Sequence, residues 1–406
     1  MFTVVKCRLC TICILIAVNI GFIVYLATNV DQSLDDDDDC DRWMDQSLVN
    51  GDHQESPINV EVWSKSAIGQ YFWETILGGH IESKMMNDLY MEGWKTIGPV
   101  RFHFRTGPSL KPESYPSFRP ANLVLILNWR SVDKINYANK WLRTLFEDLS
   151  GVPSNVGIIA LGNEFCNNTW FTDLYVDNGR YRNLRFLFLV YDSPLIDNQL
   201  IYQWPLGVAT YRHFPSPYTT DDDHKIDLQS SRPYVCNFIA TIYQNSSRQE
   251  LQNLFINNVH NWNHGCLIKT RSKWMANENV ESMDSYVQAL HSSDLTLCPS
   301  GLNVECYRIL EAVEYGSIPV IEEIVNTNDH NQCDRIQILR LFKQFDAPFI
   351  YVRNWTEQLP DLLTQYNALN LRERVKKRIQ LIKWYHHFRI RLRNHFVNVL
   401  HKRFVH

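Results

Sequence analysis

The chain lacks a dominant charge, short internal repeats and the cysteine spacing of a zinc module. Its 406 residues include 40 Lys and Arg against 44 Asp and Glu, so the formal charge is only −4. This balance argues against a general nucleic-acid-binding protein, which concentrates positive charge. Seven cysteines lie beyond residue 30 and no two of them form a CxxC pair, which argues against a zinc or redox motif.

Apolar residues, by contrast, are plentiful. The chain is 45% hydrophobic and 21% charged, which excludes a wholly disordered protein. A length of 406 residues predicts two or three domains. The charges are unevenly distributed, because residues 369–406 contain eleven Lys and Arg and a single acid, Glu373. The other residues therefore carry 29 basic and 43 acidic side chains.

Residues 9–30 form the one long uncharged segment of the sequence. These 22 residues span roughly 33 Å as a helix, enough for a hydrocarbon core of about 30 Å. Lys6 and Arg8 precede the segment and a run of Asp residues follows it. The positive-inside rule therefore predicts a cytoplasmic tail at residues 1–8, a signal anchor at 9–30 and a lumenal body. A cleaved signal peptide is the alternative interpretation.

A lumenal body predicts disulfides and N-linked glycans. Seven is an odd number of cysteines, so at least one lumenal thiol is free or pairs between chains. Sequons begin at Asn167, Asn245 and Asn354, and these three residues are the predicted glycosylation sites. Residues 31–95 are predicted as a lumenal stem, whose Asp run is most simply a solvated spacer.

The rest of the chain alternates short apolar runs with helical patterns, which is typical of α/β folds. A first series occupies residues 96–225 and a second occupies residues 226–360, so we predict two Rossmann-like domains facing a cleft. Their predicted strands are residues 123–127, 156–161, 186–191, 235–240, 266–268, 294–298 and 318–321. Residues 361–406 have apolar positions at steps of three and four, which predicts a basic amphipathic helix.

Residues 293–321 carry the most informative pattern. They read as a strand, a Pro/Gly turn, a helix, a Gly stop and a second strand, and such a turn can present backbone N–H groups to a phosphate. Arg308 lies three residues after Glu305 and three before Glu311. Arg308 could therefore bind a diphosphate while Glu311 accepts sugar hydroxyls. The alternative is an ordinary Glu–Arg–Glu ladder on a surface helix.

This segment, with its Arg, then Glu-Ala, then Gly-Ser-Ile-Pro-Val, resembles the nucleotide-sugar signature of exostosin-type glycosyltransferases. A longer resemblance is to the ribitol-5-phosphate xylosyltransferase family. It is carried by LGNEFCNN at 161–168, QWPLGVATYR at 203–212, RPYVCNF at 232–238, TIYQNSSR at 241–248, residues 293–320 and APFI at 347–350.

The resemblance implies a single-pass type II Golgi membrane enzyme of GT-B fold. Such an enzyme transfers xylose from UDP-xylose to ribitol-5-phosphate on the O-mannosyl glycan of α-dystroglycan. Residues 96–225 would be its acceptor domain and residues 226–360 its nucleotide-sugar domain, and a complex with other Golgi transferases is compatible with this role. Two alternatives stay open: an exostosin-like transferase of other sugar specificity, and a non-catalytic Golgi subunit that assists partner transferases.

The same resemblance implies the roles of individual residues. Arg308 would neutralise the departing diphosphate, and Glu311 would hold the ribose. Many retaining GT-B enzymes have a Glu eight positions before the ribose-binding Glu, where this chain has Asn303, so an inverting reaction is favoured. The full set of implied donor-binding residues is Arg248, Gly301, Asn303, Glu305, Arg308 and Glu311.

An inverting reaction needs a general base for the acceptor hydroxyl. Glu164 and Asp192 each follow a predicted strand of the first series, where α/β sites gather, so both are candidate bases. His103 and His213 are weaker candidates. Residues 221–223 are three Asp in a polar linker, which favours a solvated loop over a metal site, so no metal and no cofactor besides the donor substrate is predicted.

The basic helix at residues 361–406 has three interpretations. It packs across both domains, it attracts a phosphate-bearing acceptor glycan, or it contacts anionic lipid.

Overall fold

The computed structural model describes most of the chain beyond residue 56. The described residues are 57–85, 90–114, 120–146, 153–164, 181, 183–218, 226–257, 265–273, 275, 279–301, 303–323 and 339–405. The predicted signal anchor at 9–30, the linker Asp residues 221–223 and the sequon at Asn167 lie outside them. Among the described residues, no helix combines the length and the apolar character needed to cross a membrane.

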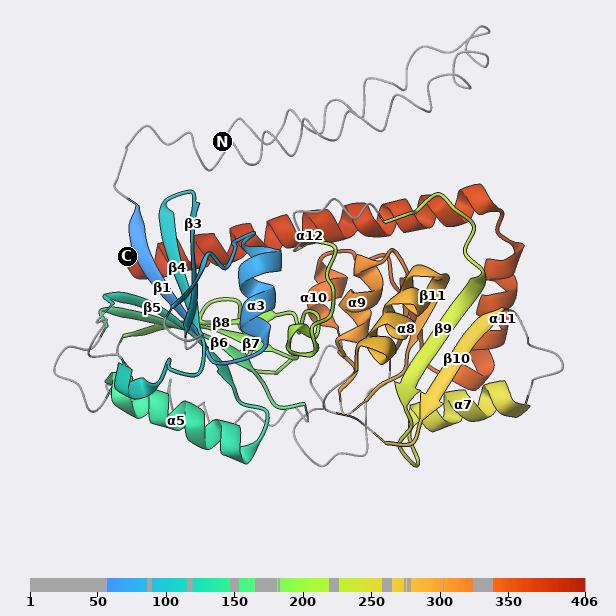
Figure 1. The fold of residues 1–406 in the computed structure, drawn as a ribbon, viewed down its shortest axis with the longest axis horizontal. Helices are drawn as coiled ribbons and strands as arrows, with labels where there is room; N and C mark the ends of the chain where they lie inside the picture. Colours follow the sequence, from blue (N-terminus) through green and yellow to red (C-terminus); the bar gives the residue numbers. More distant parts are fainter. Residues whose placement is uncertain are drawn as a thin grey trace, which may run out of the picture. The chain divides into compact units, whose positions relative to one another are not determined.

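The first half of the body is built on an eight-stranded sheet (Figure 1). Its strand order is β2-β3-β4-β1-β5-β6-β7-β8, and all neighbours are parallel except that β3 is antiparallel to β2 and β4. The strands are β1 Ile58–Ser64, β2 Ser83–Met85, β3 Tyr90–Ile97, β4 Val100–Thr106, β5 Asn122–Asn128, β6 Asn155–Leu161, β7 Leu184–Val190 and β8 Ile201–Trp204.

Strand β1 lies between β4 and β5, in the interior of this sheet. It falls within residues 31–95, which the sequence predicts as a stem, so the folded body begins at or before Ile58 rather than at residue 96. The short helix α3 (Ile68–Gln70) and the π-helix η1 (Tyr71–Ile76) follow, and they bury Tyr71, Phe72 and Trp73. The density of aromatic residues here is a sign of a core rather than of a solvated spacer.

The two faces of the first sheet are covered by different helices. Helix α5 (Val132–Phe146) covers one face, with Trp141 and Leu142 among the buried apolar residues of β5 and β6. The other face packs against η1 and against the C-terminal helix α12 (Leu371–Val405). Strands β5 to β7 are therefore buried on both faces, which explains why they appear in the sequence as continuous apolar runs.

The second half contains a five-stranded, all-parallel sheet with the order β10-β9-β11-β12-β13. A disulfide between Cys236 and Cys266 joins β9 to β10. The prediction of an α/β fold is confirmed. The elements of this half are β9 Tyr234–Thr241, α7 Ser247–Asn257, β10 Cys266–Arg271, α8 Val280–His291, β11 Ser293–Cys298, α9 Arg308–Glu314, β12 Ile318–Glu322, α10 Arg340–Gln344, β13 Ile350–Val352 and α11 Trp355–Ala368.

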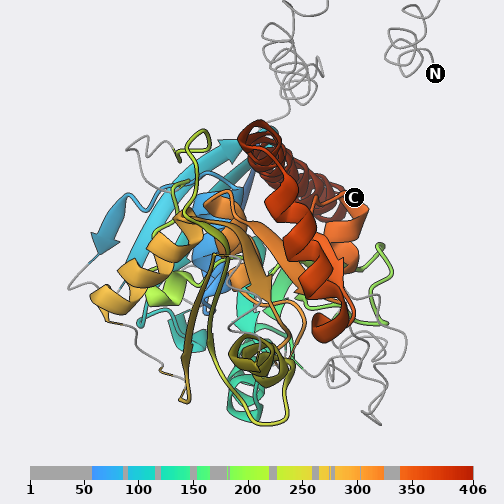
Figure 2. The ribbon, with the colours of Figure 1, turned by 90° about the vertical axis from the view of Figure 1, so that its right-hand side faces the viewer.

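Helix α12 packs against both halves, and Figures 1 and 2 place both sheets on the same side of it. Near its C-terminus, Phe396 contacts Phe72, Phe188 and Trp204 of the first half. Nearer its N-terminus, Trp384 and Phe388 contact aromatic residues of the second half, namely Phe342, Phe345 and Phe349. This arrangement corresponds to the first of the three interpretations of the basic C-terminal segment.

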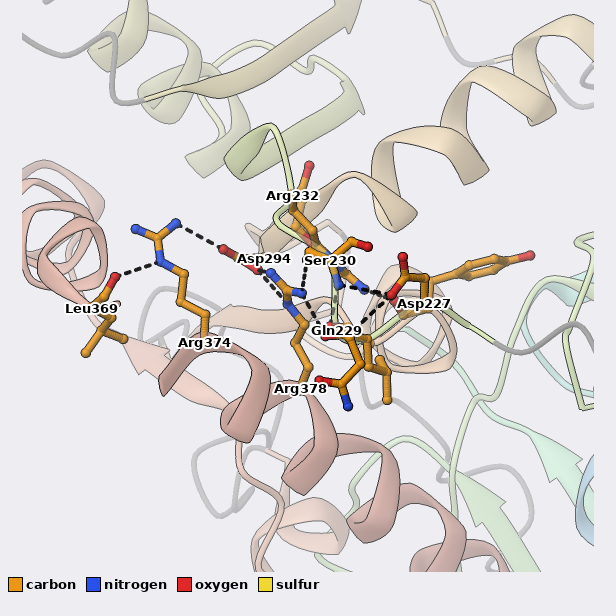
Figure 3. A network of polar contacts seen from close by, with 12 residues as sticks. Asp227, Gln229, Ser230, Arg232, Asp294, Leu369, Arg374 and Arg378 are labelled. Atoms are coloured by element: carbon orange, nitrogen blue, oxygen red, sulfur yellow. Dashed lines mark hydrogen bonds and ion pairs between the residues drawn. The ribbon is translucent and has the colours of Figure 1, made fainter. Parts of the chain in front are cut away.

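A buried ion pair fixes the N-terminal part of α12 to the second sheet (Figure 3). Both Arg378 of α12 and Asp294 of β11 are fully buried. The Arg378 guanidinium donates to Asp294 Oδ1 at 2.8 and 2.5 Å and to the carbonyl oxygens of Leu228 and Ser230 at 2.9 and 2.7 Å. Arg374 adds a longer contact of 3.3 Å to Asp294 Oδ2. Each of the three guanidinium nitrogens of Arg378 thus donates to at least one acceptor.

We predict that Arg378→Met destabilises the protein strongly. The substitution keeps the apolar volume but removes one of the two arginines that pair with the buried Asp294 carboxylate, so that Arg374 alone of the two remains. We expect the free energy of unfolding to fall by about 3–5 kcal/mol. The matched control is Lys377→Met at the adjacent exposed position, where we expect a change within about 0.5 kcal/mol. Urea unfolding followed by circular dichroism measures both values, and equal losses in the two variants would contradict the prediction.

Candidate active site

A cavity of about 390 Å³ lies where the two halves meet. The chain segments that reach it come from the carboxyl ends of parallel strands in both sheets, which is where α/β proteins bind ligands. The side chains that line it from the first half include Arg130, Glu164, Tyr191, Tyr211 and Arg212. Those from the second half include Thr241, Arg248, Lys269, Arg271, Tyr286, Gly301, Asn303, Glu305, Cys306, Tyr307, Arg308 and Glu311.

Three of the predicted donor-binding residues bind the backbone of the opposite half. Glu305 Oε1 accepts from the N–H of Leu206 at 2.7 Å, and Glu311 Oε1 accepts from the N–H of Ala209 at 3.1 Å. Asn303 Nδ2 donates to the carbonyl oxygen of Glu164 at 2.9 Å. These residues line the cavity and join the two halves.

Arg248 and Arg308 both line the cavity, and each has at least one guanidinium nitrogen without a hydrogen-bond acceptor in the part of the chain that the structure describes. Arg308 donates one bond, to the carbonyl oxygen of Ile239 at 3.0 Å, and its Nε and Nη1 are buried without a hydrogen-bond partner among the described residues. Arg248 donates to the carbonyl oxygen of Thr241 at 3.2 Å, and its Nε is likewise unpaired. Burial and the charge of Arg308 lower the pKa of Arg248. The arrangement fits an anion with several acceptor oxygens.

Gly301 allows this approach of the arginines to the loop that precedes α9. A Cβ atom at position 301 would lie 2.9 Å from Nη2 of Arg248, so a larger residue would have to displace the guanidinium. Helix α9 begins at Arg308, and the described residues before it, 299–301 and 303–307, belong to no helix or strand. Arg308 thus lies in the first turn of the helix.

The two candidate bases are in different surroundings. Glu164 lines the cavity, and its Oε1 pairs with Nη2 of Arg130 at 2.9 Å. Asp192 does not line the cavity, and its carboxylate pairs with Nε of Arg340 at 3.2 Å in a nearly buried position. Of the two candidates, Glu164 is the one that lines the described cavity, and the role of general base stays a prediction.

Neither of the weaker histidine candidates lines the cavity. His103 is buried in the first sheet, with Nδ1 2.8 Å from Glu61 and Nε2 3.1 Å from Glu92. His213 is exposed at the end of a short 3₁₀ helix, Thr210–Arg212. His103 therefore has the surroundings of a structural histidine, and His213 those of a surface histidine.

Comparison with known proteins gives the family. The family model described as RXYLT1 N-terminal domain matches residues 60–205, and the one described as RXYLT1 C-terminal domain matches residues 211–405. Ribitol-5-phosphate xylosyltransferase 1 of Danio rerio is 41% identical over 363 residues, which cover 89% of this chain and 80% of the relative. The human protein of the same name is 40% identical over 368 residues, with the same coverage. The chain belongs to the ribitol-5-phosphate xylosyltransferase family.

The resemblance inferred from the sequence is therefore confirmed. In this member of the family, the boundary between the two family domains coincides with the passage from the first sheet to the second. Among solved structures, similar chains include the catalytic domain of starch synthase IV from Arabidopsis thaliana, with a TM-score of 0.40, 11% identity and coverage of 85% of this chain and 100% of that one. Another is the N-terminal domain of trehalose-6-phosphate phosphatase from Candida albicans, with a TM-score of 0.46, 9% identity and coverage of 86% and 98%.

Several lining residues of this xylosyltransferase family member were not predicted. Arg130 lies two residues beyond the end of β5, so the rule that selects Glu164 after β6 would also have selected it. Lys269 and Arg271 lie at the end of β10, which extends beyond the predicted strand at 266–268. Tyr286 has no such signal, because its role depends on a contact of its hydroxyl with Glu311 Oε2 at 2.7 Å.

Two of the predicted glycosylation sites are among the described residues. Asn245 is exposed in the turn after β9. Asn354 is half-buried and caps α11, accepting from the N–H of Glu357 at 3.1 Å. Glycosylation at Asn167, Asn245 and Asn354 stays a prediction.

The buried carboxyl group of Glu305 generates a prediction about pH. Burial raises its pKa to about 8 in the folded protein, from 4.5 when solvated. The folded state therefore holds a proton that the unfolded chain releases, and ionisation of this residue opposes folding as the pH rises between these two values. Glu305→Gln keeps an acceptor for the N–H of Leu206 but does not ionise. Relative to the wild type, the variant should gain about 1–4 kcal/mol of unfolding free energy between about pH 5 and pH 8.

Urea unfolding at several pH values across this interval measures the gain. Other titrating groups, such as Glu314, whose pKa burial raises to about 7, act on both proteins and cancel in the difference. Glu281→Gln, at an exposed glutamate of α8, is the control and should show no trend. A difference between Glu305→Gln and the wild type that does not vary with pH would refute the assignment.

Proposed function

We propose that this chain is an inverting xylosyltransferase of GT-B type, which transfers xylose from UDP-xylose to ribitol-5-phosphate. Relatives that bear the xylosyltransferase name at 39–41% identity support the reaction. The observation that supports the site is the pair Arg248 and Arg308, whose unpaired donors lie in a cavity at the carboxyl ends of two parallel sheets. The same two-sheet architecture supports the GT-B assignment.

The donor diphosphate occupies the arginine pair in this proposal. Negative charge accumulates on the leaving UDP as the bond to xylose breaks, and fixed cations aimed at that charge stabilise the transition state more than the ground state. Two guanidiniums supply this charge without a divalent cation, so the proposal requires no metal. Glu311 accepts from Ala209 and Tyr286, and each carboxylate oxygen has a second lone pair for a ribose hydroxyl.

Glu164 is the general base in this proposal. Its Oε1 is held by Arg130, which orients the carboxylate and leaves Oε2 to accept the proton of the attacking ribitol hydroxyl. Asn303, at the position where many retaining enzymes have a Glu, donates to the backbone of Glu164. An amide there provides no carboxylate for a double displacement, which is consistent with inversion.

The setting of the reaction is also proposed. The uncharged segment at residues 9–30 anchors the enzyme in the Golgi membrane with its body in the lumen. There it meets ribitol-5-phosphate on the O-mannosyl glycan of α-dystroglycan, beside the other transferases of that pathway. The number of cations that line the cavity supports the proposal of a phosphate-bearing acceptor, because the donor diphosphate does not need all of them.

The experiment that tests the function is an assay of the purified lumenal part of the chain with a panel of UDP-sugars and a ribitol-5-phosphate acceptor. We expect transfer from UDP-xylose alone, and a loss of about 10²–10³ in kcat/KM for the control variant Arg308→Ala. Transfer of another sugar would favour an exostosin-like enzyme of different specificity. Donor binding without any turnover would favour a non-catalytic subunit.

We predict that Glu164→Gln lowers kcat by about 10²–10⁴ without a comparable change in the affinity for UDP, because the base acts on the acceptor alone. The amide can still contact Arg130, so the local structure should persist. Asp192→Asn is the comparison variant. It removes the charge that pairs with Arg340, so its main effect should be on the free energy of unfolding. The base is misassigned if Glu164→Gln keeps the pH–kcat profile of the wild type.

A further inference from the structure

Two free thiols lie beside the arginine pair. Cys298 ends strand β11 and is buried, whereas Cys306 belongs to the loop before α9 and lines the cavity. The two side chains are in hydrogen-bonding contact with each other. The disulfide that the structure describes joins two other cysteines, Cys236 and Cys266. The donor cavity therefore contains a reduced pair of cysteines with one member accessible from the cavity.

The surroundings make the two thiols chemically different. The hydrogen bond from Cys298, together with the charges of Arg308 and Arg248, lowers the pKa of Cys306 to about 6. Burial raises the pKa of Cys298. At neutral pH the pair thus consists of a thiolate in the cavity and a protonated thiol behind it, and thiolates are the nucleophilic form of cysteine.

The position of the thiolate matters more than its basicity. Arg308 keeps two buried donors unpaired and Arg248 keeps one, so small anions are attracted to the atoms that surround Cys306. A reagent that carries its own negative charge would be concentrated at this sulfur, whereas a neutral reagent would not. The same donors are those assigned to the donor diphosphate, so a group attached to Cys306 and a bound diphosphate would compete for one space.

We propose that Cys306 is a modification site for small anionic thiol reagents, and that its modification and the binding of a nucleoside diphosphate exclude each other. The first part stands on the geometry of the cysteine and arginine pairs, and the second part rests on the proposed function. In an oxidising compartment the corresponding reagent class is a small anionic disulfide.

The chemistry with such a disulfide is ordinary thiol–disulfide exchange. The Cys306 thiolate attacks one sulfur of the reagent, a bond forms between them, and the other half leaves as a thiolate. Cys298 can then lose its proton and attack Cys306, which forms a disulfide between the two residues and releases the second half as a thiolate. Two protein thiols are oxidised and one reagent disulfide is reduced to two thiols, so no further oxidant is needed.

Magnitudes decide which probe is informative. Relative to an ordinary thiol, the lowered pKa raises the thiolate fraction at neutral pH roughly thirtyfold but reduces the nucleophilicity of each thiolate roughly tenfold. A neutral alkylating reagent therefore reacts only about threefold faster than with an ordinary thiol. The attraction of an anionic reagent by two nearby cations is a separate effect, and the ratio of the anionic to the neutral rate isolates it.

The experiment compares iodoacetate with iodoacetamide on the purified lumenal part of the chain, with its disulfide intact. Alkylation of Cys306 is followed by mass spectrometry of peptides. In each case the thiolate attacks the methylene carbon, a C–S bond forms and iodide leaves. Buried Cys298 is the internal control, and the same peptide in urea gives the ordinary rate ratio. Both reagents are also tested on the Arg248→Gln variant and on the wild type with UDP added.

We expect the ratio of iodoacetate to iodoacetamide rates at Cys306 to exceed that of the unfolded peptide by about tenfold, and to fall in Arg248→Gln. In the wild type the iodoacetate rate should rise with pH around 6 and reach a plateau by neutral pH. A ratio equal to that of the unfolded peptide, or a rate that keeps rising to pH 8 or 9, overturns the modification site even if the variant fails to fold. UDP should protect Cys306. A raised ratio without protection by UDP overturns the exclusion and counts against the donor site, while the modification site stands.

Discussion

The structure depends on one long helix that packs against two sheets. Helices in proteins gain most of their stability from the packing of an apolar face, and the 35-residue helix α12 packs different aromatic residues against each half. Its N-terminal part is further fixed by a charge, Arg378, which is paired in the core. The cavity lies between the halves that α12 joins, so the relative position of Arg308 and Glu164 depends on this packing.

Five of the eleven Lys and Arg residues of α12 make the following contacts within the protein. Arg374 and Arg378 neutralise Asp294, and Arg389 lies over the ring of Tyr218 at 4.0 Å. Arg391 lies over the ring of Phe345 at 4.5 Å, and Arg403 donates to the carbonyl oxygen of Gln199 at 2.6 Å. A charge anomaly in the sequence is therefore also a packing device, since long cationic side chains cover apolar surface while their heads find acceptors or rings.

The sequence predicts what local patterns determine. Continuous apolar runs gave β5 to β7, and the pattern at residues 293–321 placed Arg308 correctly near the start of a helix. The sequence could not show that β1, with its alternating residues INVEVWS, pairs with β4 and β5. The pairing of a strand depends on partners far along the chain. The sequence also could not show that Glu305 and Glu311 bind the backbone of Leu206 and Ala209, because such contacts between distant segments leave no local signature.

The electrostatics of the cavity follow from these long-range contacts. Six cationic side chains line it, at positions 130, 212, 248, 269, 271 and 308, against three carboxyl groups, at positions 164, 305 and 311. Glu305 is held neutral by its burial until about pH 8, and Glu164 is balanced by Arg130. At neutral pH the protonated Glu305 and the Cys306 thiolate offset each other, so the six cations still outnumber the negative charges of the cavity. Burial of Glu305 between the halves raises its pKa by more than the hydrogen bond from Leu206 lowers it, so the closure of the cavity also reduces its negative charge.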